Sequence, residues 1–365
     1  MIPLSCKYFY AGILAIILVI SCTSKQELFI DYSNSQIEYS GRIDSSNMIG
    51  AELYWSGTSI KINFEGESLA VLLEDEKGEN YYNIIIDSDS LFILRVDTTK
   101  RYYQLASGLP KGKHTIEIFK RTEWDRGKTS FYGIQIKGKA KLLPRSKPFK
   151  RKMEFYGNSI TAGYAIEDTS GRDSPDSTFT NNYLSYAAIT ARNFTSDYQC
   201  ICKSGIGITV SWFPLIMPEI YDRLNPTDST SQWNFSLYTP DIVVINLFQN
   251  DSWIVNLPEL EEYKRRFGNQ SPDEEYLIDA YKDFLSKIRN QYPNAHIICS
   301  LGCMDAAKDD SKWMEYIKKA VANLNDKTIY THFMPYIEAS AHPSIKDHEK
   351  MANHLIKFIE DKIDW

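Results

Sequence analysis

The pattern of apolar and polar residues changes near the middle of the chain. In the first half, apolar and polar positions alternate over short segments that glycines separate. This period of two, with many β-branched and aromatic residues, predicts β-strands. We therefore predict an antiparallel β-sandwich over residues 29–138, followed by a linker rich in Lys, Arg and Pro at residues 139–151. The clearest strands are expected at residues 59–64, 81–87 and 114–119.

In the second half, strand-like and helix-like segments follow one another. Continuous apolar strands such as residues 242–245 are typical of a parallel sheet that helices cover on both faces. We predict an α/β domain with three layers, α/β/α, over residues 152–365. Strands are expected at residues 153–156, 199–203, 241–247, 295–301 and 328–332, and helices at 181–194, 274–291, 311–324 and the C-terminus.

The N-terminus has the pattern of a targeting segment. Lys7 precedes an apolar run at residues 11–20, which is short for a membrane-spanning helix and suits a signal peptide over residues 1–21. Ser21 directly before Cys22 resembles a bacterial lipobox, in which the Cys22 thiol is acylated and residues 22–28 form a leader. An uncleaved anchor helix is the alternative. We expect an extracytoplasmic lipoprotein, in the periplasm or at the cell surface, held to the membrane by its lipid anchor only.

Charge and motif content exclude several classes of ligand. The 365 residues include 41 Lys and Arg against 47 Asp and Glu, and the net charge of −6 repels nucleic acids. Phosphate-binding loops, dinucleotide motifs, zinc spacings and calcium loops are absent from the sequence, so we predict neither a metal nor a cofactor. Four cysteines of the folded body are expected to be buried free thiols, with a disulfide between the two pairs as the alternative: Cys200, Cys202, Cys299 and Cys303.

Residues able to cleave an ester occur where predicted strands end, which is where parallel sheets bind ligands. Ser159 lies in a glycine-flanked turn after the first of these strands, although a plain capped turn gives the same string. Gly205 and Gly207 follow the second strand, and their backbone N–H groups can approach a substrate oxygen. Asn250 follows the third strand, and its amide can donate a further hydrogen bond.

His342 is the histidine best placed to act as a general base. It stands just before Pro343 and the C-terminal helix, outside the apolar stripe of that helix. We expect His348 and His354, inside the helix, to lie on the surface. Three further histidines occur in strand-like segments and are expected to be structural: His114, His296 and His332.

The order Ser, Gly, Asn, His along successive strand ends resembles the SGNH hydrolases, also called the GDSL esterase superfamily. The resemblance implies Ser159 as nucleophile and His342 as base, because a serine needs an imidazole to take its proton. It also implies an oxyanion hole made by the Ser159 N–H, the Asn250 amide and one glycine N–H. We favour Gly207 over Gly205 for the glycine.

The chain resembles carbohydrate esterase family two over nearly all of its mature length. The motifs that carry the resemblance are residues 39–42, 54–58, 112–115 and 120–123 in the first half, and 155–164, 204–207, 240–247 and 341–344 in the second. The resemblance implies a jelly-roll sandwich before the hydrolase domain. It also implies an enzyme that removes acetyl groups from polysaccharides such as xylan or glucomannan.

Two positions depart from the superfamily pattern. Phe248 replaces a glycine two residues before Asn250, and its ring is expected to narrow or reshape the acyl pocket. Ala339 replaces the Asp three residues before His342. The His342 ring can then be oriented by Glu338 or by a backbone carbonyl, and we favour the carbonyl.

Two tryptophans are candidate platforms for sugar rings. Trp253 lies close to the proposed oxyanion donor and Trp212 follows the glycine block, although core packing is the alternative for each. Two other functions stay open at this point. One is a glycan-binding lipoprotein without catalysis, and the other is an esterase for a different acyl group.

Overall fold

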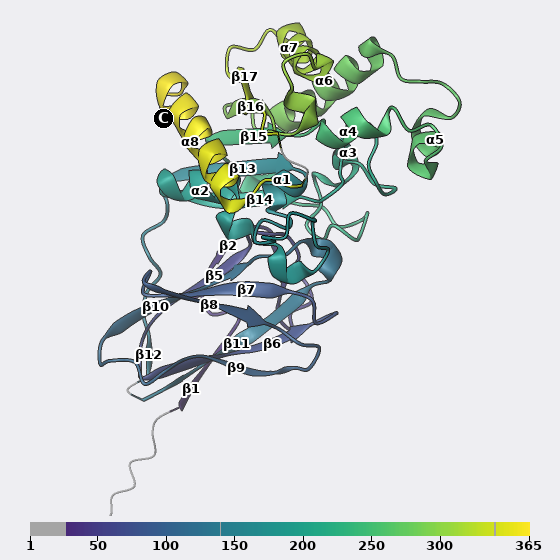
Figure 1. Ribbon diagram of the computed structural model, residues 1–365. Coiled ribbons are helices and arrows are strands. Elements are labelled where there is room, and N and C mark those ends of the chain that lie inside the picture. Colours follow the sequence, from purple (N-terminus) through teal and green to yellow (C-terminus); the bar gives the residue numbers. More distant parts are fainter. Residues whose placement is uncertain (1–26, 139, 339–340) are drawn as a thin grey trace, which may run out of the picture.

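The first domain is an antiparallel β-sandwich. The computed structural model describes residues 27–138, 140–338 and 341–365, and the sandwich forms the lower half in Figure 1. Its first sheet contains β1 (Glu27–Asp31), β3 (Ile43–Asp44), β4 (Ala51–Leu53), β6 (Ser68–Asp75), β9 (Arg101–Ser107) and β11 (Thr129–Lys137). Its second sheet contains β2 (Glu38–Ser40), β5 (Ser59–Glu65), β7 (Tyr81–Ile86), β8 (Ser90–Arg95), β10 (Lys113–Lys120) and β12 (Lys141–Leu142).

The alternating sequence explains how the two sheets pack. Along β5, Ile60, Ile62 and Phe64 are fully buried in the core between the sheets, while the residues between them are half-buried on the other face. The same period of two holds in β10, which pairs with β5 and β7. The predicted linker is not wholly irregular, because Lys141–Leu142 pairs with the end of β5 as β12.

The second domain is built on a parallel five-stranded sheet. Its strand order is β14-β13-β15-β16-β17. The first strand in the sequence, β13, therefore lies inside the sheet, with β14 on one side of it and β15, β16 and β17 in turn on the other. The strands are β13 (Arg151–Gly157), β14 (Ser196–Cys202), β15 (Ile242–Asn246), β16 (His296–Leu301) and β17 (Ile329–Phe333). Four of them begin and end within two residues of their predicted positions, whereas β14 begins three residues earlier than predicted.

Helices cover both faces of this sheet, as predicted. Val243 and Ile245 of β15 belong to the core that contacts α6 and α7, whereas Ile242 and Val244 face α2 and α8. The helices are α1 (Ser159–Ala162), α2 (Tyr186–Asn193), α3 (Met217–Ile220), α4 (Gln249–Ile254), α5 (Glu261–Phe267), α6 (Glu274–Gln291), α7 (Lys312–Leu324) and α8 (Ile345–Lys362).

The helix predicted at residues 181–194 is shorter than expected. Asn181 starts a single 3-10 turn, η3 (Asn182–Leu184), and Ser185 then breaks the helical conformation and caps α2. The Ser185 hydroxyl accepts a hydrogen bond from the Ala188 N–H at 3.3 Å. Polar side chains that compete for backbone groups in this way favour helix starts over helix interiors.

The four predicted free thiols are buried and unpaired in the structure: Cys200, Cys202, Cys299 and Cys303. The predicted signal peptide, the lipidation site at Cys22 and most of the leader lie outside the described residues. In the part of the chain that is described, every helix is too short or too polar to cross a membrane.

A buried ion pair joins the two domains. Arg42 of the sandwich contacts Glu154 of β13 at 3.0 Å, and the two side chains are 1% and 0% exposed. The Arg42 guanidinium also donates to the carbonyl oxygens of Tyr221 and Arg223, at 2.6 and 3.0 Å. The pair is therefore well bonded at the cost of removing two charges from water.

We predict that Arg42→Met destabilises the protein strongly. The substitution leaves the Glu154 carboxylate buried without its cation, which costs about 3 to 5 kcal/mol of unfolding free energy. Urea denaturation measures this loss. The matched control is Arg101→Met, which breaks an exposed pair with Asp97 in the same sandwich and should cost far less. Equal losses in the two variants would contradict the prediction.

Candidate active site

Ser159 lies at the carboxyl end of β13, where the chain turns into α1. Asn158 caps this turn by accepting a hydrogen bond from the Ile160 N–H at 3.0 Å. Gly157 is required because a Cβ there would lie 2.0 Å from the Thr161 hydroxyl oxygen. The predicted glycine-flanked turn thus presents a serine hydroxyl at the ligand-binding edge of the sheet.

His342 contacts Ser159, although the two residues are far apart in the sequence. The distance from the Ser159 hydroxyl oxygen to Nε2 of the ring is 2.8 Å. His342 reaches this place just before α8, whose N-cap Ser344 is hydrogen-bonded to Asp347. The spacing lies within the range expected between a nucleophile and its base.

Asp173 orients the His342 ring. One carboxylate oxygen accepts from Nδ1 at 2.8 Å, and the other accepts from the His342 backbone N–H at 2.8 Å. Burial raises the pKa of Asp173, but these hydrogen bonds outweigh burial and bring the pKa below its ordinary value. The carboxylate is therefore ionised near neutral pH, and the proton of the neutral ring is placed on Nδ1. Nε2 is left to accept from the Ser159 hydroxyl.

The expectation that a backbone carbonyl or Glu338 orients His342 is wrong. Glu338 is exposed, and Ala339 lies outside the described residues. Asp173 instead comes from residues 164–181, a segment between α1 and η3 that we call the Asp173 loop. The sequence offered little signal, because Asp168 and Asp176 lie in the same turn-rich stretch. Only the fold shows that Asp173, and neither of the other two, contacts the His342 ring. The Asp173 backbone has a left-handed φ of 55°.

The Asn250 amide is held in one orientation. Its oxygen accepts from the Trp212 indole N–H at 3.1 Å, and its nitrogen donates to the Ile206 carbonyl oxygen at 2.8 Å. One amide hydrogen is therefore used within the protein, and the other is available to a ligand. This arrangement suits the predicted donor role at an oxyanion hole.

The preference for Gly207 as the glycine donor is not supported by the geometry. Its N–H donates to the Ser211 hydroxyl oxygen at 2.9 Å. A Cβ at Gly207 would also lie 2.4 Å from a carboxylate oxygen of Asp251, so close packing explains this glycine. Within the described residues, the N–H groups of Gly205 and Ser159 have no acceptor. Gly205, with a left-handed φ of 82°, is therefore the glycine with a free donor.

Asp251 fixes the loop after these glycines. Its buried carboxylate accepts from the N–H groups of Ile208, Thr209 and Val210 and from the Thr209 hydroxyl. Burial nevertheless raises the pKa of Asp251. Asp251 therefore supports the neighbouring turn and does not face a ligand.

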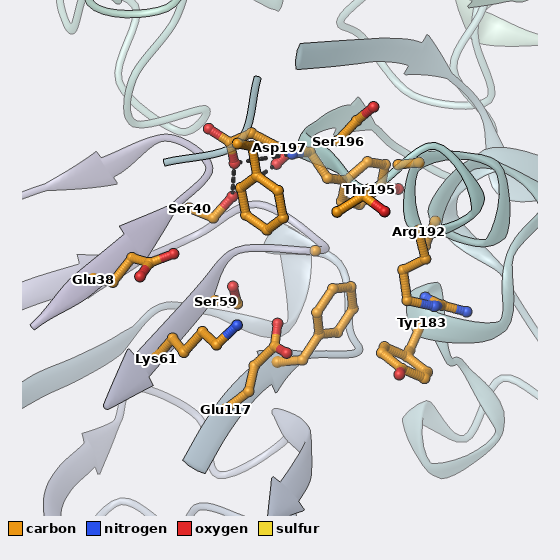
Figure 2. Close-up of a pocket in the computed structure, with 16 residues that line it drawn as sticks. Glu38, Ser40, Ser59, Lys61, Glu117, Tyr183, Arg192, Thr195, Ser196 and Asp197 are labelled. Carbon is orange, nitrogen blue, oxygen red and sulfur yellow. Dashed lines mark hydrogen bonds between the residues drawn. The ribbon is translucent and has the colours of Figure 1, made fainter. Parts of the chain in front are cut away.

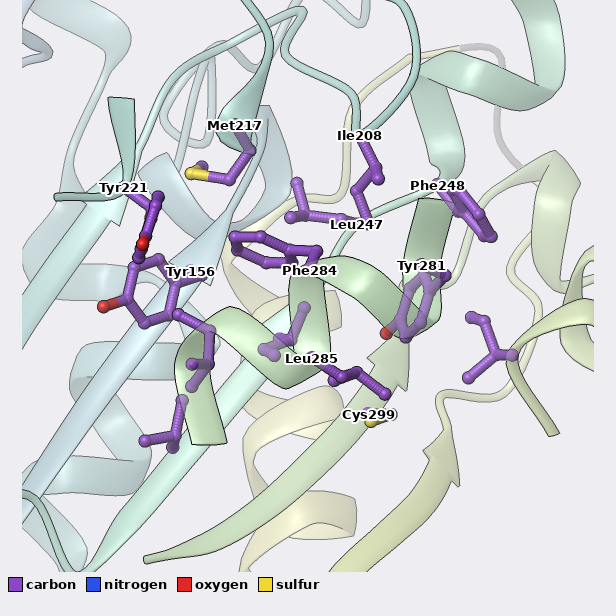
Figure 3. Close-up of a cluster of buried hydrophobic side chains, with 14 of the residues drawn as sticks. Tyr156, Ile208, Met217, Tyr221, Leu247, Phe248, Tyr281, Phe284, Leu285 and Cys299 are labelled. Atoms are coloured by element: carbon purple, nitrogen blue, oxygen red, sulfur yellow. The ribbon is translucent and has the colours of Figure 1, made fainter. Parts of the chain in front are cut away.

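Phe248 does not narrow the site, contrary to the prediction. Its ring is fully buried beside Tyr281 in the core on the α6 and α7 side (Figure 3). The centre of the ring lies 4.8 Å from that of Tyr281 and 5.0 Å from that of Trp313. Phe248 adopts a left-handed conformation with φ 88°. This conformation explains why a glycine is usual at the position, and the buried ring offsets its strain here.

The two candidate tryptophans lie in different surroundings. Trp212 is 46% exposed and bonded to Asn250, so an aromatic face borders the predicted site. Trp253 is half-buried, and its indole N–H donates to Asp305 at 3.2 Å. It lines an open cavity of about 560 Å³ whose lining includes neither Ser159 nor His342. Trp212 is thus the better placed of the two.

One more expectation about the histidines is wrong. His348 is 1% exposed, and its ring stacks on Tyr186 and accepts from the Tyr186 backbone N–H at 3.1 Å. Burial, together with nearby His342, lowers the pKa of His348 to about 3, so it stays neutral. His354 is exposed as predicted.

A further cavity of about 280 Å³ opens between the two domains (Figure 2), and Ser159 is not among the residues that line it. Aromatic rings of Phe119, Phe149 and Tyr183 line it together with charged side chains such as Glu117.

The described residues contain no group of three or more His, Cys, Asp or Glu side chains placed to hold a metal ion.

A serine, a histidine and an aspartate joined by hydrogen bonds at the edge of a parallel sheet are the constellation of a serine hydrolase. Comparisons with known proteins define the family. Residues 39–145 match the family model described as carbohydrate esterase 2 N-terminal. A solved family two carbohydrate esterase from Clostridium thermocellum, in complex with cellohexaose, is 36% identical, with a TM-score of 0.80 over 90% of this chain and 99% of that one. The chain belongs to carbohydrate esterase family two.

Curated relatives carry related names. The cellulase/esterase CelE of Acetivibrio thermocellus is 36% identical over 346 residues, which is 92% of this chain and 40% of that protein. The chain thus spans less than half the length of that relative. An acetylxylan esterase / glucomannan deacetylase of Cellvibrio japonicus is 23% identical and is covered over 95% of its length.

We predict that glycine is more stable than alanine at position 248. Phe248→Ala empties a buried site and keeps the left-handed backbone, so it should lower the free energy of unfolding by about 3 to 5 kcal/mol. Phe248→Gly empties the same site but relieves the backbone, so it should be about 1 kcal/mol more stable than Phe248→Ala. Urea unfolding of the two variants measures the difference. The reverse order, which is normal at unstrained positions, would show that the conformation is not left-handed.

Proposed function

We propose that this protein removes acetyl groups from acetylated plant polysaccharide or oligosaccharide, such as xylan or glucomannan, through a serine acyl-enzyme. The observation that carries the proposal is the hydrogen-bonded chain from Ser159 through His342 to Asp173, with 2.8 Å at both ring nitrogens. The names of the relatives support the acetylated carbohydrate as substrate.

The reaction follows from the position of each proton. Nε2 of His342 takes the Ser159 hydroxyl proton while the serine oxygen attacks the acetyl carbonyl carbon. The carbonyl oxygen becomes an oxyanion, which the free N–H groups of Ser159 and Gly205 and the spare Asn250 hydrogen stabilise. His342 then returns its proton to the departing sugar oxygen. Water, activated by the same ring, releases acetate and restores Ser159.

Asp173 contributes by stabilising the imidazolium that exists between these proton transfers. Its carboxylate faces Nδ1 and is ionised near neutral pH because its pKa is low. A carboxylate stabilises the imidazolium more than a neutral carbonyl would. The serine is therefore activated by a triad and not by a dyad.

The substrate side of the proposal rests on an exposed aromatic ring beside Asn250. The exposed face of Trp212 borders the oxyanion donor Asn250, and sugar rings stack well on such faces. Phe248 does not restrict the acyl group, since its ring points into the core. We also propose that the protein is an extracytoplasmic lipoprotein, on the pattern of Ser21 and Cys22 in the sequence.

We predict that Ser159→Ala abolishes acetate release from acetylated xylan and glucomannan. The loss should be complete within the assay, because the acyl-enzyme cannot form. Oligosaccharide binding, measured by calorimetry, should be retained and serves as the control for folding. A wild type that binds glycan but releases no acetate would favour the glycan-binding alternative. A preference for long acyl chains in a nitrophenyl ester series would favour a different ester.

We predict that Asp173→Asn lowers kcat by about 10²- to 10⁴-fold. The amide has no charge to stabilise the imidazolium and can favour the wrong ring tautomer. The matched control is Glu338→Gln, which changes an exposed carboxylate that precedes His342 by four residues. Steady-state acetate release compares the two. A large loss in Glu338→Gln with a small one in Asp173→Asn would reverse the assignment.

A further inference from the structure

Two residues just after β10, in the sandwich domain, are bonded to the active-site loops of the other domain. They are Arg121 and Glu123, which lie in the run at residues 120–123 without contacting Ser159 or His342. Both are almost fully buried. Burying a charged group is costly unless it is paired and hydrogen-bonded. The partners of Arg121 and Glu123 therefore indicate the roles of these two side chains.

Arg121 holds the two ends of the Asp173 loop together. Its Nε donates to the Thr180 carbonyl oxygen at 3.2 Å, and its terminal nitrogen donates to the Thr178 carbonyl oxygen at 2.8 Å. The same guanidinium forms an ion pair with Glu167. Because Glu167 precedes Asp173 and Thr178 follows it, one buried side chain fixes the loop on both sides of the aspartate.

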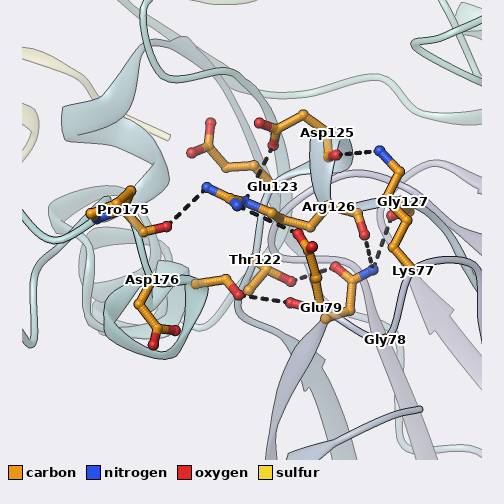
Figure 4. Close-up of polar contacts among 12 residues, drawn as sticks. Lys77, Gly78, Glu79, Thr122, Glu123, Asp125, Arg126, Gly127, Pro175 and Asp176 are labelled. Carbon is orange, nitrogen blue, oxygen red and sulfur yellow. Dashed lines mark hydrogen bonds and ion pairs between the residues drawn. The ribbon is translucent and has the colours of Figure 1, made fainter. Parts of the chain in front are cut away.

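The sandwich contacts the same loop at further points (Figure 4). Arg126 donates to the Pro175 carbonyl oxygen at 3.2 Å, and the Ser177 hydroxyl donates to the Glu79 carbonyl oxygen at 3.0 Å. Asp173 itself has a left-handed backbone that costs energy for a residue other than glycine. The surrounding contacts therefore have to impose this conformation, and those from the sandwich bond the loop on both sides of Asp173.

Glu123 holds the turn that carries the free glycine N–H. One of its carboxylate oxygens accepts from the Ser204 hydroxyl at 2.6 Å, and the other accepts from the Ser204 backbone N–H. Ser204 directly precedes Gly205. Lys203, on the other side of Ser204, lies 3.7 Å from the same carboxylate and 3.2 Å from Asp125.

We propose that Arg121 and Glu123 are positioning residues of the esterase site: Arg121 places Asp173 against the His342 ring, and Glu123 places the Gly205 N–H in the oxyanion hole. The sandwich domain then contributes to catalysis by holding two active-site loops in place. The inference rests on the proposed function, and it assigns to two residues of the sandwich different effects on one reaction.

The two roles have different kinetic signatures in the full-length protein. Arg121→Met loosens Asp173, so the imidazolium is less stabilised and the acid limb of the kcat/KM profile moves to lower pH, by about one unit. Glu123→Ala leaves that limb in place and lowers kcat by about 10- to 100-fold, since misplacing an oxyanion donor by about 1 Å has this effect. KM for acetylated xylo-oligosaccharide should change less than twofold in both.

A double-mutant cycle separates positioning from a general loss of stability. Arg121→Met should cost little further activity in the Asp173→Asn background, because its effect is exerted through Asp173. An ordinary structural effect would be additive. The milder variants Arg121→Lys and Glu123→Gln serve if the larger truncations fail to fold. Ser40→Ala and Glu117→Gln are matched controls, since both alter the domain junction without contacting either loop.

One readout does not require esterase activity. The proton on Nδ1 of His342, hydrogen-bonded to Asp173, should give a downfield proton resonance that weakens in Arg121→Met and persists in Glu123→Ala, Ser40→Ala and Glu117→Gln. An unchanged resonance in Arg121→Met overturns the role of Arg121. Unchanged kcat in Glu123→Ala with an active wild type overturns the role of Glu123. If the wild-type protein releases no acetate, the proposed function itself is overturned.

Discussion

The imidazole of His342 has hydrogen-bond partners on both ring nitrogens, and the chemistry of the site depends on this. Asp173 accepts from Nδ1, which leaves Nε2 to accept from the Ser159 hydroxyl. Neither bond alone activates the serine, because the ring must be both oriented and able to hold a second proton. The three groups come from a turn after β13, a long loop and the start of α8. They meet because parallel strands bring their carboxyl ends to one edge of the sheet.

This arrangement is supported from the sandwich domain. Three buried side chains of the sandwich form hydrogen bonds with groups of the α/β domain: Arg42, Arg121 and Glu123. Buried charged contacts of this kind add little net stability, but they penalise any other relative placement of the domains, because a displaced charge would stay buried without its partners. We interpret the junction as the feature that keeps two active-site loops in register with the sheet.

The two departures from the superfamily pattern have different physical explanations. At Phe248 the missing glycine is tolerated because the ring fills the core beside Tyr281 and Trp313, which compensates for a left-handed backbone. At the missing aspartate before His342, the carboxylate is supplied by Asp173, 169 residues earlier in the chain. The sequence shows both departures clearly. It does not show where a ring points or which distant side chain fills a vacant role, since both depend on packing.

Local patterns in the sequence were enough to predict the two domain types, the five parallel strands and the long helices. Those features follow from periodicity and from turn residues at strand ends, which act over a few neighbouring residues. The pairing of Ser159 with His342 was implied by the resemblance to the SGNH hydrolases. The tertiary structure alone decided which carboxylate orients His342, which glycine N–H stays free and that His348 is buried. These depend on hydrogen-bond partners drawn from distant segments. No local pattern specifies such partners, because the same Asp, Gly or His is equally compatible with the surface.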